Sequence, residues 1–588
     1  MRLKKLKIFA TLLCVFFLHI CNNAFSANIT GDNEITSDST TQQKFNADDT
    51  SLTITNSSTL DRNTGQKPIH INEKSNGTVT IHSGSSAVAT ANTIAGDDTT
   101  GLTINNSGTI TSTGSKAINL LDGTDASIVN NSGGIINSKT NAISISKNGT
   151  TPDNITITNS GTIYTTNGST NTIVFHSSAT DSTITNNSGG HIYNTSTNAV
   201  IAIGKTTTLT NSGKIENKQS PSEESIKVQG GNNTIILKDG GIVIGTIQNS
   251  SANTNTLKIQ HGVGQGYFYE TSGSGTFNLE DADGNQIVQG SAGSVGQGAS
   301  ETQDELLGYK SLNIRKSLNR YKKNKNKLNE NEEWGETFGS LIKRNQNDTS
   351  LSLGYSFINL GVNIIYPLEK SDHILFFETG RQKFKRDHDV NHLSFLSGIN
   401  FSNINSETFI LGGATLHESK RTILTNTTTT GTLDVEDNYY SVKALTGTKF
   451  KSKKLIPDFG FTASGSITPN HSESKYYTWN TKSILNLSAY FEDEYNFNIK
   501  NEKNNLNLGW NIDLRKLVVG DEQDYKINGT KATYTQDNDL TEEVVFSANV
   551  EFLKKISNSE KLSFGLDGFL STQEAGGFQA SINYIMKL

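Results

Sequence analysis

Apolar and polar residues alternate along the last segment of the chain, which runs from Phe578 to Leu588. The apolar face of this segment consists of Phe578, Ala580, Ile582, Tyr584, Met586 and Leu588. A period of two predicts a β-strand with one apolar and one mostly polar face. A row of strands that are apolar outside and polar inside, ending on such a strand, is typical of an outer-membrane β-barrel.

Other segments of the region 331–588 alternate in the same way and supply about twelve strands. The apolar positions predicted to face lipid include Leu351, Leu353, Tyr355, Phe357, Leu506, Leu508, Trp510, Ile512, Leu514, Val544, Phe546, Ala548, Val550, Phe552, Leu562, Phe564 and Leu566. The connection 556–561 is short and the connection 519–540 is long and polar, as expected for the two ends of a barrel. A soluble β-domain with the apolar faces in its core is the alternative.

The region 27–300 carries a different pattern, a repeat of the form apolar-Thr-Asn-Ser-Gly-x-Ile with steps of 24 to 28 residues. Its register marks are Ser58, Gly84, Gly108, Gly133, Gly161, Gly189 and Gly213. A period of this length predicts a solenoid, here a right-handed parallel β-helix with glycine at its corners. An amide ladder along its axis is expected from Asn56, Asn106, Asn131, Asn159, Asn187 and Asn211.

The segment 301–330 is the one good helix candidate, because Leu307, Ile314, Leu318 and Tyr321 recur at helical spacing. Acidic residues lie at its start and Lys and Arg gather at its end, as the helix dipole favours. Two interpretations are open: a linker helix on the surface, or a basic helix inside a water-filled barrel.

The N-terminus has the three parts of a secretory signal peptide, a basic stretch, an apolar stretch and an exit with small residues. We expect a signal peptide over residues 1–26, with cleavage after Ser26 or after Ala27. Cys14 and Cys21, the two cysteines of the chain, both lie in this segment, so the mature chain has no disulfide.

The composition agrees with an all-β chain rich in turns, with 53 Gly, 6 Pro and 33% hydrophobic residues. The formal net charge of −6 argues against a nucleic-acid partner. No catalytic motif is found, and neither enzymatic activity nor a cofactor is expected. Asp125, Asp153 and Asp181 each lie eight residues before a glycine mark, and are weak candidates for a Ca²⁺ site; the competing interpretation is a recurring Asx turn.

The order of a signal peptide, a β-helix, a helix and a C-terminal barrel resembles the autotransporters, the type Va secretion family. The specific points of resemblance are the segment EEWGETFGS (332–340), which is similar to the first barrel strand of the family, and the terminal strand. In the family the terminal strand is the signal for barrel assembly, which assigns that role here to Phe578, Ala580, Ile582, Tyr584, Met586 and Leu588. Family members usually end on Phe or Trp, whereas this chain ends on Leu588.

The resemblance implies an outer-membrane protein of a Gram-negative bacterium that exports its own passenger and displays it on the cell surface. The implied partners are outer-membrane lipid, the barrel-assembly machinery and periplasmic chaperones, and a host or sister-cell surface if the passenger is an adhesin or aggregation factor. Some members release the passenger by cleavage between adjacent asparagines in the helix, but 301–331 has no Asn-Asn pair, so an attached passenger is expected. The alternatives are an autotransporter with a carbohydrate-active passenger, and a secreted soluble β-helix protein.

Overall fold

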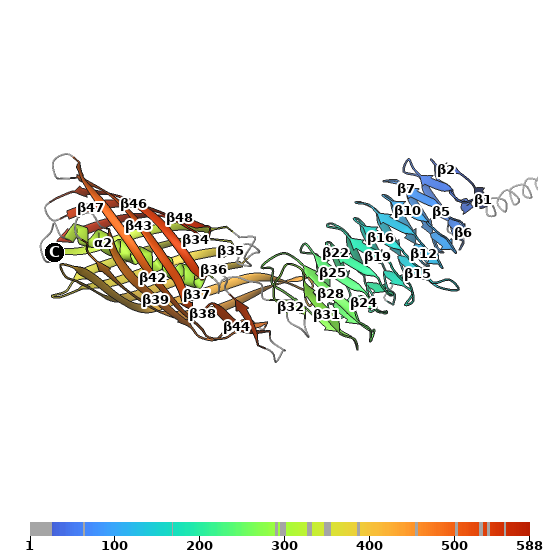
Figure 1. Cartoon of the computed structure of the whole chain (residues 1–588). Coiled ribbons are helices and arrows are strands. Elements are labelled where there is room, and N and C mark those ends of the chain that lie inside the picture. Colours follow the sequence, from blue (N-terminus) through green and yellow to red (C-terminus); the bar gives the residue numbers. More distant parts are fainter. Residues whose placement is uncertain are drawn as a thin grey trace, which may run out of the picture.

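The computed structural model describes residues 26–62, 65–166, 169–287, 292–294, 302–325, 332–345, 354–384, 388–452, 457–474, 476–499, 504–527, 533–537, 541–557 and 560–587. Most of the expected signal peptide and also Leu351, Leu353 and Leu588 therefore lie outside the described residues. The chain forms a solenoid and a barrel that lie end to end, with the C-terminus at the end of the barrel far from the solenoid (Figure 1). Over these residues, no helix has both the length and the apolar character that crossing a membrane requires.

Three parallel sheets form the sides of the solenoid. Sheet 1 consists of β1 (Ser26–Ile29), β3 (Gln42–Phe45), β6 (Ile69–Asn72), β9 (Ile94–Asp97), β12 (Ile118–Leu121), β15 (Ile143–Ser146), β18 (Ile173–Phe175), β21 (Ile201–Ile203), β24 (Glu224–Val228), β27 (Thr246–Asn249) and β30 (Thr271–Ser272). Sheet 2 consists of β2 (Asp32–Ile35), β4 (Ser51–Ile54), β7 (Thr78–Ile81), β10 (Thr103–Asn106), β13 (Ser127–Asn130), β16 (Thr156–Asn159), β19 (Thr183–Asn186), β22 (Thr208–Asn211), β25 (Thr234–Lys238), β28 (Asn255–Gln260) and β31 (Phe277–Asp281). Sheet 3 consists of β5 (Thr59–Arg62), β8 (Ser86–Ala89), β11 (Thr109–Ser112), β14 (Ile135–Ser138), β17 (Thr162–Thr165), β20 (His191–Asn194), β23 (Lys214–Asn217) and β26 (Ile242–Ile244).

Aliphatic side chains stack from coil to coil inside the solenoid, because each short strand turns every second residue inward. One such column belongs to sheet 2, and all of its members are fully buried: Ile104, Ile128, Ile157, Ile184, Leu209 and Ile235. Stacking of this kind buries the apolar side chains of every coil against both of its neighbours. The parallel β-helix predicted from the repeat is confirmed.

A ladder of buried asparagines follows one corner of the solenoid, but three of the six expected members do not belong to it. The amide of each asparagine donates to the next one at 2.7–2.8 Å, in the order Asn106, Asn130, Asn159, Asn186 and Asn211. The neighbouring Asn131 and Asn187 had been expected in this row, and Asn56 lies in a turn with φ 57°. The turns 130–134 and 186–190 are two residues longer than the turn 159–161. The ladder asparagine therefore does not always lie two residues before the glycine mark.

A closed antiparallel barrel of twelve strands follows the solenoid in the described chain. Its strands are β33 (Glu332–Arg344), β34 (Tyr355–Pro367), β35 (Asp372–Phe384), β36 (His388–Ser402), β37 (Ser406–Thr425), β38 (Thr432–Phe450), β39 (Asp458–Thr468), β42 (Lys482–Ile499), β43 (Asn504–Val519), β46 (Glu542–Lys555), β47 (Glu560–Ser571) and β48 (Ala575–Lys587). The first and last strands pair with each other, for example Trp334 with Ile585 and Leu341 with Phe578. The predicted all-β fold, the strand number and the role of 332–340 as the first barrel strand are confirmed.

The outer face of the barrel is a belt of large apolar side chains that no other part of the described chain covers. It includes Ile358, Leu360, Leu393, Phe395, Ile410, Phe461, Leu514, Phe546, Phe564, Leu566, Phe578 and Ile582, with Leu360 64% exposed and Phe461 56% exposed. Tyr355 and Phe357 had been expected in this belt, but they are buried inside the barrel, where they pack with Tyr309 and Leu312. The helix that passes through the lumen therefore covers these two rings, so that they face protein and not lipid.

The barrel end that faces the solenoid carries additional structure. A small antiparallel sheet lies there, formed by β40 (His471–Glu473), β41 (Tyr477–Trp479), β44 (Glu522–Ile527) and β45 (Tyr534–Asp537). Two short strands join the solenoid to this end, β29 (Tyr267–Tyr269) and β32 (Ala292–Ser294), which pair with each other. The connections at the other end are short, and one of them joins β36 to β37 through Asn403–Asn405.

Candidate functional site: the barrel lumen

The helix α2 (Gln303–Lys325) lies inside the barrel (Figure 1). The four residues that predicted it, Leu307, Ile314, Leu318 and Tyr321, are all buried. They pack against inward aromatic and aliphatic side chains of the wall, among them Trp334, Phe376, Leu396 and Leu445. The interpretation as a basic helix within a barrel is confirmed, and the surface linker helix is excluded.

Ion pairs join this helix to carboxylates on at least six strands of the wall. The pairs are Lys310–Glu378 at 2.7 Å, Arg315–Asp513 at 3.1 Å, Arg320–Asp567 at 3.0 Å, Lys316–Asp567 at 3.4 Å, Lys322–Glu407 at 3.3 Å, and the close contacts Arg320–Glu336 and Lys323–Glu494. A reverse pair holds the start of the helix, where Arg344 of β33 lies 2.8 Å from Glu305. Buried charges require such partners, so the wall and the helix fit each other in charge as well as in shape.

The basic residues of the helix were evident from the sequence, but the carboxylates of the wall that pair with them were not. Most of these wall carboxylates are single acids in the inward row of an amphipathic strand, such as Asp513 between Asn511 and Arg515, or Asp567 opposite Gln579. A single acid in a polar row is equally common in strands that face water. Only the register of the closed barrel places these acids at matching heights along α2.

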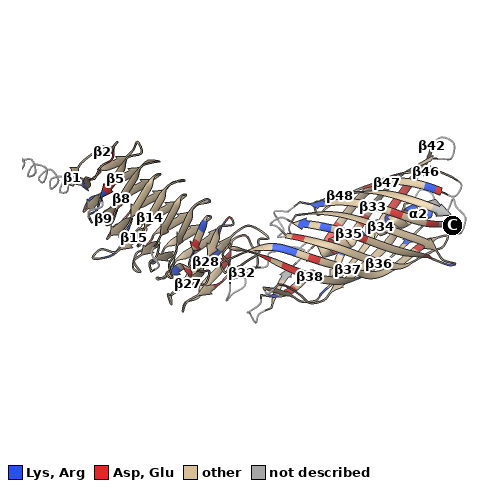
Figure 2. Cartoon of the chain, turned by 180° about the vertical axis from the view of Figure 1, so that it is seen from behind, with Lys and Arg blue, Asp and Glu red and all other residues tan. Residues whose placement is uncertain are grey.

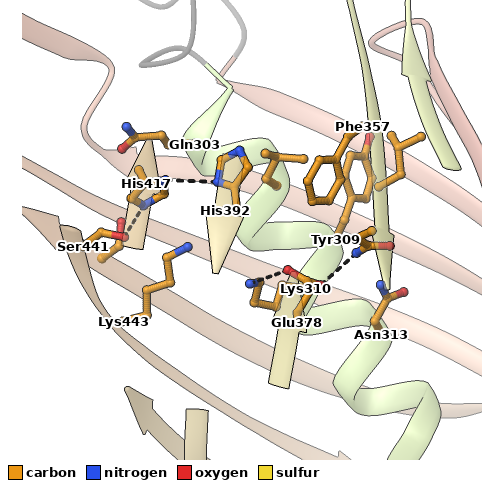
Figure 3. A pocket seen from close by; sticks show the side chains of 14 residues that line it. Gln303, Tyr309, Lys310, Asn313, Phe357, Glu378, His392, His417, Ser441 and Lys443 are labelled. Carbon is orange, nitrogen blue, oxygen red and sulfur yellow. Dashed lines mark hydrogen bonds and ion pairs between the residues drawn. The ribbon is translucent and has the colours of Figure 1, made fainter. Parts of the chain in front are cut away.

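A small cavity lies beside the first turns of α2, as Figure 3 shows. Its strand side carries His392 of β36, His417 of β37, and Ser441 and Lys443 of β38. The two Nδ1 atoms of His392 and His417 lie 3.0 Å apart, and Nε2 of His417 lies 2.9 Å from Oγ of Ser441. On the helix side, Lys310 donates to Oγ of Ser394 at 2.6 Å. The Ser441–His417–His392 contacts form one hydrogen-bonded row along the wall, and Lys310 joins the helix to the same side of the lumen through Ser394.

The three aspartates weighed as a Ca²⁺ site do not form a column. Asp153 pairs across coils with Thr124 and Thr180, one position away from Asp125 and Asp181. The side chain of Asp125 accepts from Asn154 at 2.7 Å, and that of Asp153 accepts from Thr180 at 2.8 Å. Asp125 and Asp181 have φ of 54° and 49°, as expected for turn residues. Within the described residues, no cluster of three or more His, Cys, Asp or Glu side chains is placed to hold a metal.

The remaining predicted sites lie at the two ends of the described chain. Ser26 and Ala27 begin β1 and pair with Gln42 and Gln43 of β3, so cleavage after Ser26 would remove one residue of that strand. In the terminal strand β48, the side chains of Phe578, Ala580, Ile582 and Tyr584 point outward and are exposed. Met586 belongs to β48, and Leu588 lies outside the described residues.

Comparison with known proteins gives weak likenesses in structure. No family model matches the sequence, and no curated protein matches it. The translocator domain of the autotransporter NalP from Neisseria meningitidis is 10% identical, with a TM-score of 0.36, and covers 50% of this chain and 100% of its own. The β-domain of the Bordetella autotransporter BrkA is 8% identical, with a TM-score of 0.30 and coverage of 44% and 100%. The transport unit of AIDA-I from Escherichia coli is 8% identical, with a TM-score of 0.27 and coverage of 44% and 90%.

At these scores the architecture is established by the strand pairing of the chain itself. A parallel solenoid is followed by a helix in the lumen of a closed barrel, and the first and last barrel strands are the two segments that suggested the family. This is the architecture that the resemblance to autotransporters implies.

Proposed function

We propose that the protein is an outer-membrane autotransporter that exports its own solenoid and displays it on the cell surface. The observation that carries this proposal is the path of the chain through the barrel. Thr302, at the start of the helix, accepts a hydrogen bond from Gln382 at 2.8 Å near the solenoid end of the wall, and Lys323 contacts Glu494 near the opposite end. The polypeptide therefore links the solenoid to the barrel through the lumen, as expected of a chain that passed through it.

The outer belt supports the membrane part of the proposal. Its exposed Leu, Ile and Phe side chains form a continuous apolar surface that water would solvate poorly, whereas lipid tails would cover it at no such cost. The long connections and the small sheet then lie on the outer side, together with the solenoid. The C-terminus and the short connections lie on the periplasmic side, where we propose that β48 meets the barrel-assembly machinery.

The solenoid itself supports a mechanism for export without a nucleotide. Every coil that stacks outside buries aliphatic side chains, and burial stabilises by about 25 cal/mol per Å² of apolar surface. A coil that has folded is too wide to return through a lumen, so stacking opposes backward movement. We propose that folding from the barrel outward draws the passenger across the membrane.

We further propose that the displayed solenoid is an adhesin or aggregation factor that acts by binding and not by catalysis, and that it stays attached. Charged residues are sparse along most of the solenoid and numerous along the barrel (Figure 2). Outward Ser, Thr and Asn side chains offer many weak hydrogen bonds to a host or sister-cell surface. Two neighbouring rods with so little charge do not repel each other strongly.

The test is a variant that lacks residues 50–250, expressed beside the full chain. The deletion should abolish clumping or attachment of cells and should leave a heat-modifiable barrel band in the outer-membrane fraction. Clumping that persists without these coils would overturn the adhesin proposal. A full-length chain recovered in the soluble fraction would overturn the outer-membrane proposal.

A further inference from the structure

Sheet 3 of the solenoid ends earlier than its neighbours at the barrel side. Among the described strands, sheets 1 and 2 have eleven members and sheet 3 has eight, and its last strand is β26. A parallel sheet that simply stops leaves a row of unpaired backbone groups, which is a template for pairing with other chains. The solenoid therefore needs a cover next to β26.

The tip of the barrel hairpin β37–β38 lies at that position. Its Asn426 is buried and donates through its amide to the backbone oxygens of Gly245 at 3.1 Å and Glu270 at 2.9 Å. Oδ1 of Asn426 accepts from the backbone N–H of Glu270 at 2.8 Å. The backbone oxygen of Asn426 accepts from the backbone N–H of Gly245 at 2.9 Å. One barrel residue thus satisfies backbone groups of two successive solenoid segments.

Glycine at the other side of the tip permits the close approach. Gly431 has φ 77°, and a Cβ at this position would lie 2.2 Å from Cγ2 of Ile242, the first residue of β26. The two contacts place the tip against the end of sheet 3, where a further strand would follow.

A second set of contacts holds the same end of the solenoid. Strand β29 pairs with β37 of the barrel, Tyr267 with Leu424 and Phe268 with Thr425. The buried Tyr477 of the small sheet donates to the backbone oxygens of Tyr267 and Ser294, at 3.3 Å each. All of these solenoid residues precede the segment 295–301, so none of the contacts depends on the covalent connection to α2.

We propose that the outer end of the barrel is a receptor for the last coils of its own solenoid, with the hairpin tip 425–431 as the cap of sheet 3. The barrel holds the solenoid by these non-covalent contacts, and a cut between Ser294 and Thr302 does not release it. This role goes beyond the proposed export and adhesion, because it describes what keeps the rod on the membrane after the chain is broken.

The experiment uses the full-length chain in mild detergent, with a recognition sequence for a specific protease inserted between Ser294 and Thr302. After complete cleavage, confirmed on a denaturing gel, the two fragments should co-elute in size-exclusion chromatography. The variant Asn426→Ala loses three side-chain hydrogen bonds to the solenoid and should separate at least roughly tenfold faster. The matched control Thr430→Ala lies on the same tip, and its side chain makes hydrogen bonds within the hairpin, to Thr428 and Thr432, so it should behave as the wild type.

Two further readings complete the test. Hydrogen exchange of the uncut chain should show a protected Glu270 amide in the wild type and an unprotected one in Asn426→Ala, while the heat-modifiable barrel band confirms that the variant folds. The proposal is overturned if the wild-type fragments separate as fast as those of Asn426→Ala, or if Asn426→Ala holds its solenoid as firmly as Thr430→Ala. The assay needs neither cells nor a surface, so its outcome is independent of the proposed display.

Discussion

The guanidinium of Arg315, on the helix inside the barrel, lies 3.1 Å from the carboxylate of Asp513 on β43 and stacks 3.6 Å from the ring centre of Tyr490. Both charged groups are buried, so each depends on the other for its stability in the lumen. Replacing Arg315 with Ala leaves Asp513 with the more distant Arg515, at 3.5 Å. We expect a loss of about 3 kcal/mol in the free energy that keeps α2 seated.

The measurement is single-channel recording of the full chain in planar bilayers, together with the temperature at which the folded band disappears. Arg315→Ala should open the lumen more often and melt earlier than the wild type. Lys516→Ala is the control, because its pair with Glu542 is largely exposed and such pairs contribute little. Equal behaviour of the two variants would show that the lumenal pairs do not hold the helix.

The asparagine ladder predicts a large difference between a residue in the ladder, Asn159, and one beside it, Asn131. Asn159→Ala removes a buried amide that accepts from Asn130 and donates to Asn186, both at 2.8 Å, and breaks the ladder between these two residues. The expected cost is about 1–3 kcal/mol in the stability of the solenoid. Asn131→Ala, next to the ladder, loses only an exposed bond to Ser107 and should be close to neutral. Denaturant titration followed by far-UV circular dichroism compares them, and equal midpoints would contradict the register described here.

Two corner glycines are expected to respond differently to alanine. A Cβ at Gly161 would lie 2.2 Å from the backbone oxygen of Gly134, and the backbone can yield only by opening the corner, so we expect a loss of about 3 kcal/mol. At Gly189 there is open space, and the cost is the strain of φ 85°, about 1–2 kcal/mol. The same titration compares the two variants. A larger loss of stability in Gly189→Ala than in Gly161→Ala would contradict this prediction.

Acidification should weaken the solenoid through its half-buried histidines. Burial lowers the pKa of His191 below its ordinary 6.5, although Glu216, 2.9 Å from its Nε2, acts in the opposite direction. The unfolded chain then binds the proton more tightly than the folded chain, so the stability present above pH 6.5 is lost as the pH falls below it. The melting temperature should fall between pH 7.5 and 5.5, by less in His191→Gln than in the wild type. An equal fall in both would assign the effect to other groups.

Periodicity along the sequence was enough to predict the fold class, the helix and the closure of the barrel. The alternation from Phe578 to Tyr584 correctly predicted which side chains of β48 point outward. It could do so because the alternation of side chains along a strand depends only on neighbouring residues. The segments 332–340 and 578–587 are the first and last strands of one sheet, and they pair because that sheet closes into a barrel.

Long-range register was beyond the reach of the sequence. The sequence predicted Asn131 in the ladder where the structure has Asn130. Counting back from a glycine mark does not account for a turn whose length differs from coil to coil. Tyr355 and Phe357 were placed outside because a strand pattern shows two faces but not what lies inside the barrel. Asp513 could not be matched to Arg315, since 198 positions separate the two residues and only the closed wall brings them together.

Surface exposure of the solenoid on intact cells tests the central claim most directly. A specific protease site inserted after Gly149, in the exposed turn 147–150, can be cut only by a protease that reaches the solenoid. Added to intact cells, the protease should cut the full-length chain, as seen on a denaturing gel, and should leave the barrel folded in the outer membrane. Cleavage that occurs only after the outer membrane has been permeabilised would contradict the account.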